Sequence, residues 1–389
     1  MYEGRFILIT RKFGDLNLPL LGLGNMRLPV KIDGNTISID SVKVREMIDY
    51  AMGNKMNYYD TAYFYHGGES EPFLGEALSE YSRESYFLAT KYNIDASADY
   101  KLVFEKQLSR LRTDYIDFYL IHSIFDHSFQ RYLDSGCIEY FLKLQRMGKI
   151  HYFGFSTHAN IPTTTALVSR YQWDFAMIQM NYYDWLYGNA KQEYELMVQN
   201  NIPIMVMEPL KGGFLASLPE NAKAILKKKR KDWSATSWAF HWLKKFPDLN
   251  VILSGMSTLE QLKENIAALS DNEQLDSEDE VVLAKVCEHL HGGLVVHCTG
   301  CRYCSDLCPV CINVPRIIKI YNHYKSNAPF PMQDFTSDSS EVKLSDCKKC
   351  GLCNKTCPQG IDVMNIITEL SAHRLNLLLR YRRILRQSN

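Results

Sequence analysis

The sequence lacks the features of a membrane or a secreted protein. No apolar run reaches the roughly 20 residues that a helix needs to cross a bilayer. The first 13 residues carry charges around a brief apolar run at residues 6–9, which is too short for the apolar region of a signal peptide. We therefore expect a cytoplasmic protein with no membrane contact.

The chain has no excess of charge of either sign. Its 44 lysine and arginine residues balance 44 aspartate and glutamate residues. Surfaces that recognise nucleic acids are strongly basic, so this balance gives no sign of such a partner. We expect no nucleic acid among the ligands of this protein.

Cysteine is scarce in most of the chain and dense near its end. Only Cys137 and Cys287 precede residue 298, and the other nine of the 11 cysteines lie within residues 298–357. In a chain without an export signal, such density favours bound metal over disulfides. We expect Cys137 and Cys287 to be buried thiols. The change in composition predicts two domains, residues 1–290 and residues 291–389.

The first domain alternates between strand-like and helix-like segments. Eight short apolar runs are typical of strands: Leu18–Met26, Asn57–Ala62, Ser85–Tyr92, Ile116–Ile124, His151–His158, Phe175–Tyr183, Pro203–Leu210 and Asn250–Ser257. Most are continuous apolar segments, as expected for strands covered on both faces. They recur at intervals of about 25–35 residues, the size of one strand–helix unit. This alternation predicts a closed (β/α)8 TIM barrel, with an open doubly wound sheet as the alternative.

Polar residues stand at the ends of consecutive strand-like runs. They are Asp60, Lys91, His122, Ser156, Gln179, Asn181 and Glu208. Tyr65 follows the second run, just ahead of a Gly67-Gly68 turn. In a (β/α)8 barrel the chemistry gathers where strands end at their carboxyl side. Core packing does not explain polar residues at the ends of successive strands, so we expect an active site at the carboxyl end of the barrel.

Four of these side chains supply what the reduction of a carbonyl group requires. The reaction places a hydride on carbon and a proton on oxygen, and a free tyrosine, with a pKa of about 10, gives up its proton poorly near neutral pH. A lysine ammonium beside the phenol favours the phenolate, and a carboxylate keeps that ammonium charged and in place. A histidine can hold the carbonyl oxygen. The four candidates are Tyr65, Lys91, Asp60 and His122.

These four residues, their order and their flanks resemble the aldo/keto reductases. The likeness runs from about Arg11 to Asn265 and includes Tyr59-Asp60-Thr61-Ala62-Tyr63, Ala89-Thr90-Lys91, Asp117–His122, Gly154-Phe155-Ser156, Ile178-Gln179 and Glu264-Asn265. Members of that family are (β/α)8 barrels that move hydride between NAD(P)H and aldehydes or ketones. The resemblance implies that Tyr65 is the general acid, that Lys91 and Asp60 tune it, and that His122 orients the substrate.

The resemblance also implies a site for a nicotinamide cofactor. Gly24, Asn25 and Met26 would lie near the cofactor on the first strand. Ser156 and Gln179 would hydrogen-bond the amide of the nicotinamide.

The chain departs from the family pattern around that cofactor site. Many members stack a tyrosine on the nicotinamide where this chain has Met207. Members selective for NADP often carry a basic residue after the eighth strand, where this chain has Gly255-Met256-Ser257. The choice between NAD and NADP therefore stays open. Lys211 either contacts the pyrophosphate of the cofactor or is a solvated loop lysine.

The cysteine-rich tail contains one spacing twice. Cys298, Cys301, Cys304 and Cys308 precede Pro309, and Cys347, Cys350, Cys353 and Cys357 precede Pro358. This is the bacterial ferredoxin run for [4Fe–4S] clusters, in which the fourth cysteine ligates the other cluster. The expected ligand sets are Cys298, Cys301, Cys304 and Cys357 for one cluster, and Cys347, Cys350, Cys353 and Cys308 for the other.

Two alternatives remain for the tail. Two zinc sites of four cysteines each are possible, although three cysteines within seven residues fit zinc poorly. Cys311 is a spare cysteine that could replace Cys308 as a ligand. A barrel followed by a small ferredoxin-like domain resembles a bacterial and archaeal subgroup of the aldo/keto reductases.

The two halves handle electrons differently, which limits how they cooperate. Nicotinamide gives up two electrons as hydride, whereas a cluster passes one at a time, and the chain has neither a flavin motif nor G-x-G-x-x-G. We expect an NAD(P)H-dependent oxidoreductase acting on a small-molecule carbonyl substrate. The alternatives are a reductase supplied with single electrons by a ferredoxin-like redox partner, and a non-catalytic electron carrier or redox sensor.

The basic end (Arg380, Arg382, Arg383, Arg386) is either solvated or docks an acidic redox partner.

Overall fold

The computed structural model describes residues 8–33, 36–293, 296–325 and 344–372. The chain forms two compact units. The first combines Met1–Lys211 with Leu215–Ala284, and the second combines Gly212–Phe214 with Lys285–Asn389. Each unit has its own apolar core.

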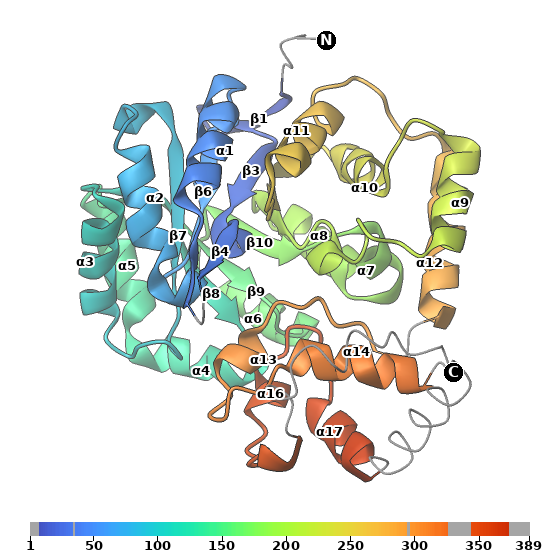
Figure 1. The fold of residues 1–389 in the computed structure, drawn as a ribbon. Coiled ribbons are helices and arrows are strands. Elements are labelled where there is room, and N and C mark those ends of the chain that lie inside the picture. The colour runs from blue at the N-terminus through green and yellow to red at the C-terminus, as the bar shows by residue number, and fades with distance from the viewer. Residues whose placement is uncertain (1–7, 34–35, 294–295, 326–343, 373–389) are drawn as a thin grey trace. The chain divides into compact units, whose positions relative to one another are not determined.

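The first unit is built on a closed barrel of eight parallel strands (Figure 1). In chain order they are β3 (Leu21–Gly24), β6 (Tyr58–Asp60), β7 (Phe87–Tyr92), β8 (Ile116–Ile124), β9 (Ile150–Thr157), β10 (Phe175–Gln179), β11 (Ile204–Met207) and β12 (Leu249–Ser254). Each strand pairs with its neighbours in the sequence, and β12 pairs with β3 to close the ring. The predicted barrel is confirmed, and the open-sheet alternative is wrong.

Helices surround these strands (Figure 1). They include α1 (Ser41–Gly53), α2 (Ser70–Leu78), α3 (Tyr100–Leu111), α5 (Cys137–Arg146), α6 (Ile161–Arg170), α8 (Ala190–Gln199), α10 (Ala235–Lys244) and α11 (Leu259–Ala268). Several begin at a side chain that accepts a hydrogen bond from the first turn, namely Asp40, Asp99, Asn160, Ser234 and Thr258. Such caps satisfy backbone amides that have no partner within the helix.

A hairpin of β1 (Thr10–Phe13) and β2 (Leu16–Pro19) covers the amino-terminal end of the barrel. Phe13 belongs to the barrel's inner cluster, and its ring contacts those of Tyr152 and Phe118 at centroid distances of 4.9 and 5.4 Å. The sequence predicted one strand over Leu18–Met26, whereas the chain forms two. Pro19 has no amide hydrogen to continue a ladder, which is consistent with the break after it.

The inside of the barrel is packed rather than hollow. Its cluster consists of Phe13, Leu18, Tyr58, Ala89, Phe118, Leu120, Phe175, Met177, Met205, Val251 and Leu253. At Gly154 an added Cβ atom would lie only 2.5 Å from the carbonyl oxygen of Phe175, so only glycine fits there. Because the interior is filled, a site has room only at an end of the barrel, and in this fold sites lie at the carboxyl end of the strands.

Three segments at the carboxyl end differ from the prediction. β10 ends at Gln179, and Asn181 then caps α7 (Tyr182–Tyr187), so the predicted strand is too long. Residues 123–135, which the sequence alone predicts to be a loop, contain α4 (Asp126–Ser135). An antiparallel pair, β4 (Val30–Asp33) and β5 (Thr36–Ile39), follows the first barrel strand and was not predicted.

Two further helices lie within residues 212–293 and contact each other through an ion pair. They are α9 (Glu220–Lys229) and α12 (Ser277–Gly293). Arg230, just after α9, pairs with the fully buried Asp279 of α12. Cys137 and Cys287 are both buried, as predicted.

The second unit is a small helical module with its own core. Its helices are α13 (Tyr303–Asp306), α14 (Val314–Lys325), α16 (Leu352–Lys355) and α17 (Val363–Ala372). Apolar residues of α14 and α17, including Ile317 and Ile367, pack in one cluster with several of the cysteines. The sequence predicts a helix over Pro315–Tyr324, and these residues do lie within α14. Residues 328–332 and the basic end from Arg380 to Arg386 lie outside the described residues.

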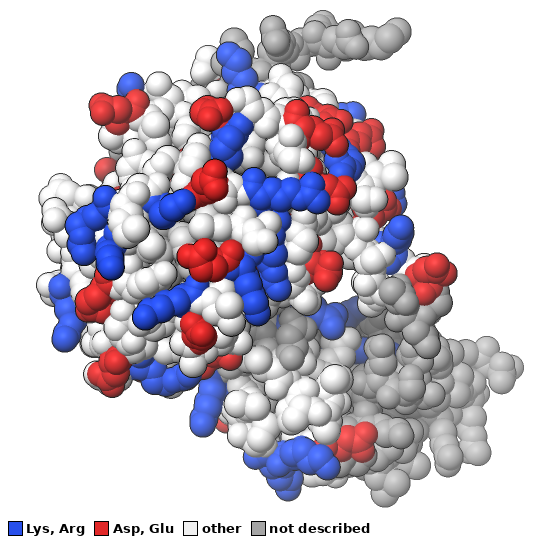
Figure 2. Space-filling model, turned by 90° about the vertical axis from the view of Figure 1, so that its left-hand side faces the viewer, with Lys and Arg blue, Asp and Glu red and all other residues white. Residues whose placement is uncertain are grey.

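The charges on the barrel are mixed rather than segregated. Figure 2 shows basic and acidic side chains interspersed on the side that carries α2 and α3. Arg45 of α1, for example, pairs with Glu76 of α2 and with Glu80 just after that helix. Among the described residues, no helix is long and apolar enough to span a bilayer.

Candidate functional site

The centre of the site is a buried ion pair between neighbouring strands. Asp60 ends β6 and Lys91 lies near the end of β7, and these strands pair side by side. The Lys91 ammonium lies 2.6 Å from Oδ1 of Asp60 and 2.6 Å from the carbonyl oxygen of Thr61. Lys91 is 1% exposed and Asp60 is 4% exposed. Water is thus excluded from both charged groups.

Burial acts on the two charges in opposite ways. It raises the pKa of Asp60, and the neighbouring Lys91 opposes that rise. It lowers the pKa of Lys91, and Asp60 opposes that fall. Each charge thus offsets part of the cost of desolvating the other.

Tyr65 lies beside this pair. It is buried and begins a short 3-10 turn after β6, in which His66 and Gly67 both adopt left-handed backbone angles. The Lys91 ammonium lies 5.0 Å from the centre of the Tyr65 ring. The structure thus brings the predicted tyrosine and lysine together.

His122 completes the predicted set of four. Its ring lies edge-on to the Tyr65 ring at a centroid distance of 5.8 Å and stacks on Phe64 at 5.1 Å. Burial, followed by the positive charge of Lys91, holds the pKa of His122 well below its usual 6.5. His122 is therefore a neutral imidazole at neutral pH.

The backbone of His122 is fixed by side chains that the sequence did not single out. Tyr132 of α4 and Asn93 both donate hydrogen bonds to its carbonyl oxygen, at 2.9 and 3.3 Å. The register between β8 and β9 shifts just after this point, and Ser123 adopts a left-handed φ of 54°. The hydroxyl oxygen of Ser156 accepts a hydrogen bond from the Ser123 amide at 2.8 Å. No local pattern marks Tyr132 or Asn93 in advance.

The three residues predicted on the first strand lie at the same end of the barrel. Gly24 ends β3, and Asn25 and Met26 form the 3-10 turn that follows. Asn25 is fully buried, and its side-chain amide donates to the carbonyl oxygen of Asp60 at 2.9 Å. Asn25 thus ties this turn to the strand that carries the ion pair.

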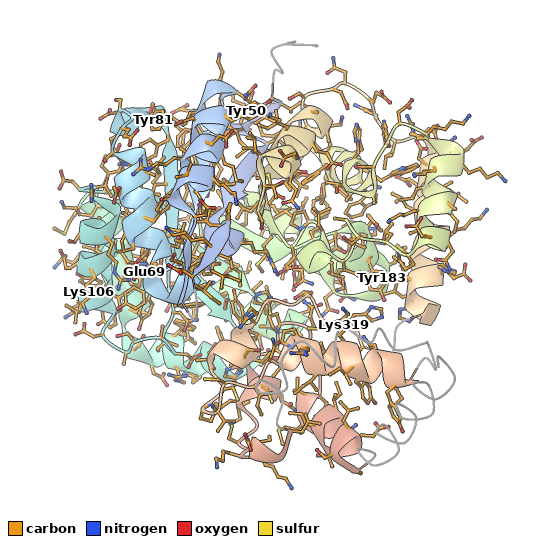
Figure 3. The ribbon with its side chains drawn as sticks, in the orientation of Figure 1. Tyr50, Glu69, Tyr81, Lys106, Tyr183 and Lys319 are labelled. Atoms are coloured by element: carbon orange, nitrogen blue, oxygen red, sulfur yellow. The ribbon has the colours of Figure 1, made fainter. Side chains whose placement is uncertain are left out.

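Gln179 and Lys211 meet at a residue that the sequence analysis missed. Asp184 of α7 accepts from Gln179 at 2.7 Å and from Lys211 at 2.5 Å on its two oxygens. Lys211 is only 3% exposed, so its interpretation as a solvated loop lysine is wrong. Its ammonium also lies 5.3 Å from the ring centre of Tyr183, on α7 in Figure 3. A signal for Asp184 was its place three residues after the capping Asn181.

Two predicted cofactor residues flank these groups. Met207 ends β11 and packs against the barrel's inner cluster. Gly255 directly follows β12, and an added Cβ atom there would touch the side chain of Arg27 at 3.4 Å. Met207 thus lies at the end of its strand and Gly255 just beyond the end of the next, and their contact with a cofactor stays a prediction.

The second unit contains two cysteine-lined cavities. Cys298, Cys301, Cys304 and Cys357 line one of them. Cys308, Cys347, Cys350 and Cys353 line the other, which Cys304 also borders. Each cavity thus combines three cysteines of one run with the fourth cysteine of the other run.

The other lining residues of these cavities are mainly apolar. They include Pro315, Ile318, Ile361 and Val363 in the first, and Val310, Ile312, Leu352 and Ile367 in the second. Four thiols around an apolar cavity suit a [4Fe–4S] cluster, whose four irons each take one thiolate. In the described part of the chain, Cys311 is exposed and lines neither cavity.

Comparison with known proteins agrees with both units. Residues 20–283 match the model of the aldo/keto reductase family, and residues 297–362 match a 4Fe-4S dicluster domain. The second match favours iron–sulfur clusters over the zinc alternative.

Individual relatives cover the barrel. An uncharacterized oxidoreductase, YqkF of Bacillus subtilis, is 27% identical over 66% of this chain and 90% of its own length. The L-galactose dehydrogenase of Arabidopsis thaliana is 26% identical over 70% of this chain and 91% of its own length. The NADH-specific methylglyoxal reductase of Escherichia coli is 26% identical over 60% of this chain and 84% of its own length.

A solved structure supports the same assignment. The aldo-keto reductase AKR11C1 of Bacillus halodurans superimposes with a TM-score of 0.60 and 25% identity, over 72% of this chain and 96% of that chain. With its family model matched over more than half of its length, this chain belongs to the aldo/keto reductase family and carries a 4Fe-4S dicluster domain after the barrel.

Proposed function

We propose that the barrel reduces the carbonyl group of a small aldehyde or ketone with NAD(P)H, and that Tyr65 donates the proton. The observation that carries this proposal is the buried Lys91–Asp60 ion pair beside the Tyr65 ring. A buried ion pair seldom makes a protein more stable than apolar side chains would in the same place. Folding stability alone therefore does not explain why an ion pair is found here. It is suited to hold a positive charge next to a phenol.

The side chains divide the work of proton transfer. The Lys91 ammonium favours the phenolate form that Tyr65 reaches when it protonates the substrate oxygen. Asp60 keeps the ammonium charged in a site that excludes water. His122, as a neutral imidazole, donates a hydrogen bond to the carbonyl oxygen and orients it. The nicotinamide cofactor supplies the hydride when it is bound.

Residues around the carboxyl end of the barrel would hold that cofactor. Ser156 accepts a hydrogen bond from Ser123, which leaves its hydroxyl hydrogen to donate to an amide oxygen. Gln179, held by Asp184, would be the second amide contact. Gly24, Asn25, Met26, Met207, Lys211 and Gly255 are the further proposed contacts. One relative is named NADH-specific, and both NADH and NADPH remain candidates here.

In the second unit we propose two [4Fe–4S] clusters, one in each cysteine-lined cavity. The ligands would be Cys298, Cys301, Cys304 and Cys357 in one cavity, and Cys347, Cys350, Cys353 and Cys308 in the other. Bound clusters supply one-electron transfer. We keep the boundary between the domains near residue 290 as part of this proposal.

These cavities favour a second candidate function. Single electrons from a ferredoxin-like redox partner would reach a substrate in the barrel through the clusters, with nicotinamide secondary or absent. This candidate uses the second unit directly, whereas the first leaves it a structural, sensing or separate electron-transfer role.

One set of measurements separates the two candidates. We would purify the protein anaerobically, measure its iron and sulfide, and titrate NADH and NADPH by fluorescence. Carbonyl compounds would then be screened with each cofactor and with reduced ferredoxin. Saturable binding of a nicotinamide and its oxidation by a carbonyl substrate support the first candidate. Turnover with ferredoxin alone, without nicotinamide binding, would replace it with the second.

A further inference from the structure

The first turn of α2 contacts the ends of three barrel strands. Ser70 and Glu71 open this helix, and both are fully buried. The Ser70 hydroxyl lies 2.9 Å from that of Thr61, which follows β6, and donates to the carbonyl oxygen of Asn25, which follows β3, at 3.3 Å. Glu71 contacts the third strand, β7. This turn therefore connects segments that carry separate parts of the candidate site.

Glu71 is connected to the end of β7 both directly, through Thr90, and indirectly, through Gln107. Its Oε1 atom accepts hydrogen bonds from the Thr90 hydroxyl and from the side-chain amide of Gln107, both at 2.7 Å. The same Gln107 nitrogen also donates to the carbonyl oxygen of Lys91 at 3.0 Å. Tyr119 of β8 fixes Gln107 in turn by donating to its amide oxygen at 2.7 Å. Glu71 and Gln107 thus determine where the backbone of Lys91 lies.

The other oxygen of Glu71 reaches the loop that carries Tyr65. Arg110 of α3 donates to Oε2 of Glu71 and to the carbonyl oxygen of Tyr63, both at 3.2 Å. Its guanidinium also lies 4.6 Å from the ring centre of Tyr63. Tyr63 stands two residues before Tyr65, so one arginine links Glu71 to the segment of the phenol.

The contacts of Glu71 are those of a carboxylate. Three donors, the side chains of Thr90, Gln107 and Arg110, converge on its two oxygens. A protonated carboxyl would present a donor of its own, which this arrangement does not accommodate. Burial raises the pKa of Glu71, and these three partners oppose the rise.

We propose that Glu71 is a positioning residue for proton donation, because it joins the strand that carries Lys91 to the loop that carries Tyr65. This inference rests on the proposed function of the barrel. Glu71 touches neither substrate nor cofactor. It acts through Gln107 on one side and through Arg110 on the other.

The charge of Glu71 adds a second effect on Lys91. The groups that face this lysine are Asp60 of β6, Tyr65 after it, His122 of β8 and Glu71 of α2. Asp60 and Glu71 are the two carboxylates among them, and both raise the pKa of Lys91 against the effect of burial. Without the charge of Glu71, Lys91 would lose its proton at a lower pH.

The test is the substitution Glu71→Gln. The new amide keeps an oxygen for Thr90 and Gln107, but its nitrogen faces the guanidinium of Arg110, donor against donor. We expect kcat with a carbonyl substrate to fall by about tenfold, while the KM for the nicotinamide cofactor changes by less than about twofold, as for an interaction that matters mainly in the transition state. The alkaline limb of kcat against pH should move to lower pH.

Glu69→Gln is the matched control. Glu69 is exposed and directly precedes α2 (Figure 3). Its substitution removes a charge of the same sign two residues away from Glu71. It should leave both kcat and the pH profile unchanged. Equal effects of Glu69→Gln and Glu71→Gln would reduce the role of Glu71 to general electrostatics and overturn the inference.

If the Glu71→Gln protein does not fold, a second variant tests the same link between Glu71 and the Tyr65 loop. Arg110→Gln breaks the link to Tyr63 from a side chain that is 29% exposed, so folding is less dependent on it. It should lower kcat in the same way, and the double variant should be no worse than the poorer single variant. Additive losses, or full activity of a folded Arg110→Gln protein, would reject the link. If Tyr65→Phe is fully active, the proposed function itself is wrong, whereas an inactive Tyr65→Phe with a fully active Glu71→Gln rejects only this inference.

Discussion

The ammonium of Lys91 and the carboxylate of Asp60 meet at 2.6 Å at the ends of two neighbouring strands, where both are shielded from water. Each group is tolerated in this place only because the other is present. Stability and the proposed chemistry therefore depend on the same contact.

We predict that Asp60→Asn and Lys91→Met each destabilise the protein, by about 3–5 kcal/mol, because each leaves one buried charge without its partner. The double variant should regain a large part of that loss, because it buries no charge. Urea unfolding of the barrel, followed by fluorescence, measures all three. Equal and additive losses would mean that the two groups do not interact in the folded protein.

The hydroxyl of Tyr65 is expected to be the proton donor. Tyr65→Phe should reduce kcat by at least about a hundredfold, the low end of what general acid catalysis contributes. Binding of the nicotinamide cofactor, measured by fluorescence titration, should be unchanged. Tyr81→Phe is the control, because its hydroxyl bonds only the surface residue Asp49 among the contacts described (Figure 3). A Tyr65→Phe enzyme with the rate of the Tyr81→Phe enzyme would assign the proton to another group.

The cysteine-lined cavities predict which cysteines share a cluster. Cys298→Ser and Cys357→Ser should each lower the iron content from about eight to about four per chain, and combining them should cause no further loss. Combining Cys298→Ser with Cys308→Ser should remove nearly all the iron. Cys311→Ser should retain both clusters. Iron and sulfide analysis of anaerobic preparations gives the answer, and loss of a cluster in Cys311→Ser would make that residue a ligand.

Stability should fall in mild acid because of buried histidines. Burial lowers the pKa of His158 from 6.5 to about 4. Between pH 6.5 and about pH 4 this histidine is protonated in the unfolded chain but not in the folded chain. The free energy of unfolding therefore decreases as the pH falls through this range, and this histidine does not affect it above the range. His122 acts in the same direction.

The variant His158→Asn tests this effect. The dependence of Tm on pH between about 4 and 6.5 should become shallower, since one of the responsible groups is removed. His127→Asn is the control, because His127 is exposed yet stacks on the same Phe125 ring at 5.3 Å, against 5.4 Å for His158. A slope that changes equally in both variants would assign the effect to the ring contact and not to titration.

The close approach of α2 to α3 leaves no room for a methyl group at Gly75. A Cβ atom there would lie 2.2 Å from the carbonyl oxygen of Arg110. We expect Gly75→Ala to cost about 1–3 kcal/mol of stability and to lower activity, because it moves the helix that carries Glu71. Gly53→Ala, where no atom lies within 4 Å of the added Cβ, should be neutral. Thermal unfolding of the two proteins decides the matter.

The barrel and the four central residues were predictable because both leave a local pattern. A buried parallel strand is a continuous apolar run, and a polar residue that ends such a run, as Lys91 and His122 do, stands out. The amphipathic stretches Tyr100–Leu111 and Ala190–Gln199 likewise predict helices, and they match α3 and α8 to the residue. Each of these features depends on residues close together in the chain.

The features that were missed depend on contacts between distant segments. Glu71 appears in the sequence as an ordinary charged residue near the start of a helix, and only the fold surrounds it with Thr90, Gln107 and Arg110. The sequence left Lys211 open between a pyrophosphate contact and a solvated loop lysine, and only the fold buries it against Asp184 of α7. β4 and β5 are only four residues long each, and their pairing leaves Ile32 and Ile37 72% and 68% exposed, so they form no buried apolar run of the kind that marked the barrel strands.

The exchange of a fourth cysteine between the two runs means that neither run is self-sufficient. A fragment ending before Cys347 would leave one cavity with three thiols and the other with one from its own set. The module therefore cannot be divided into two self-contained halves, and an insertion or loss in either run would change the thiols of both cavities.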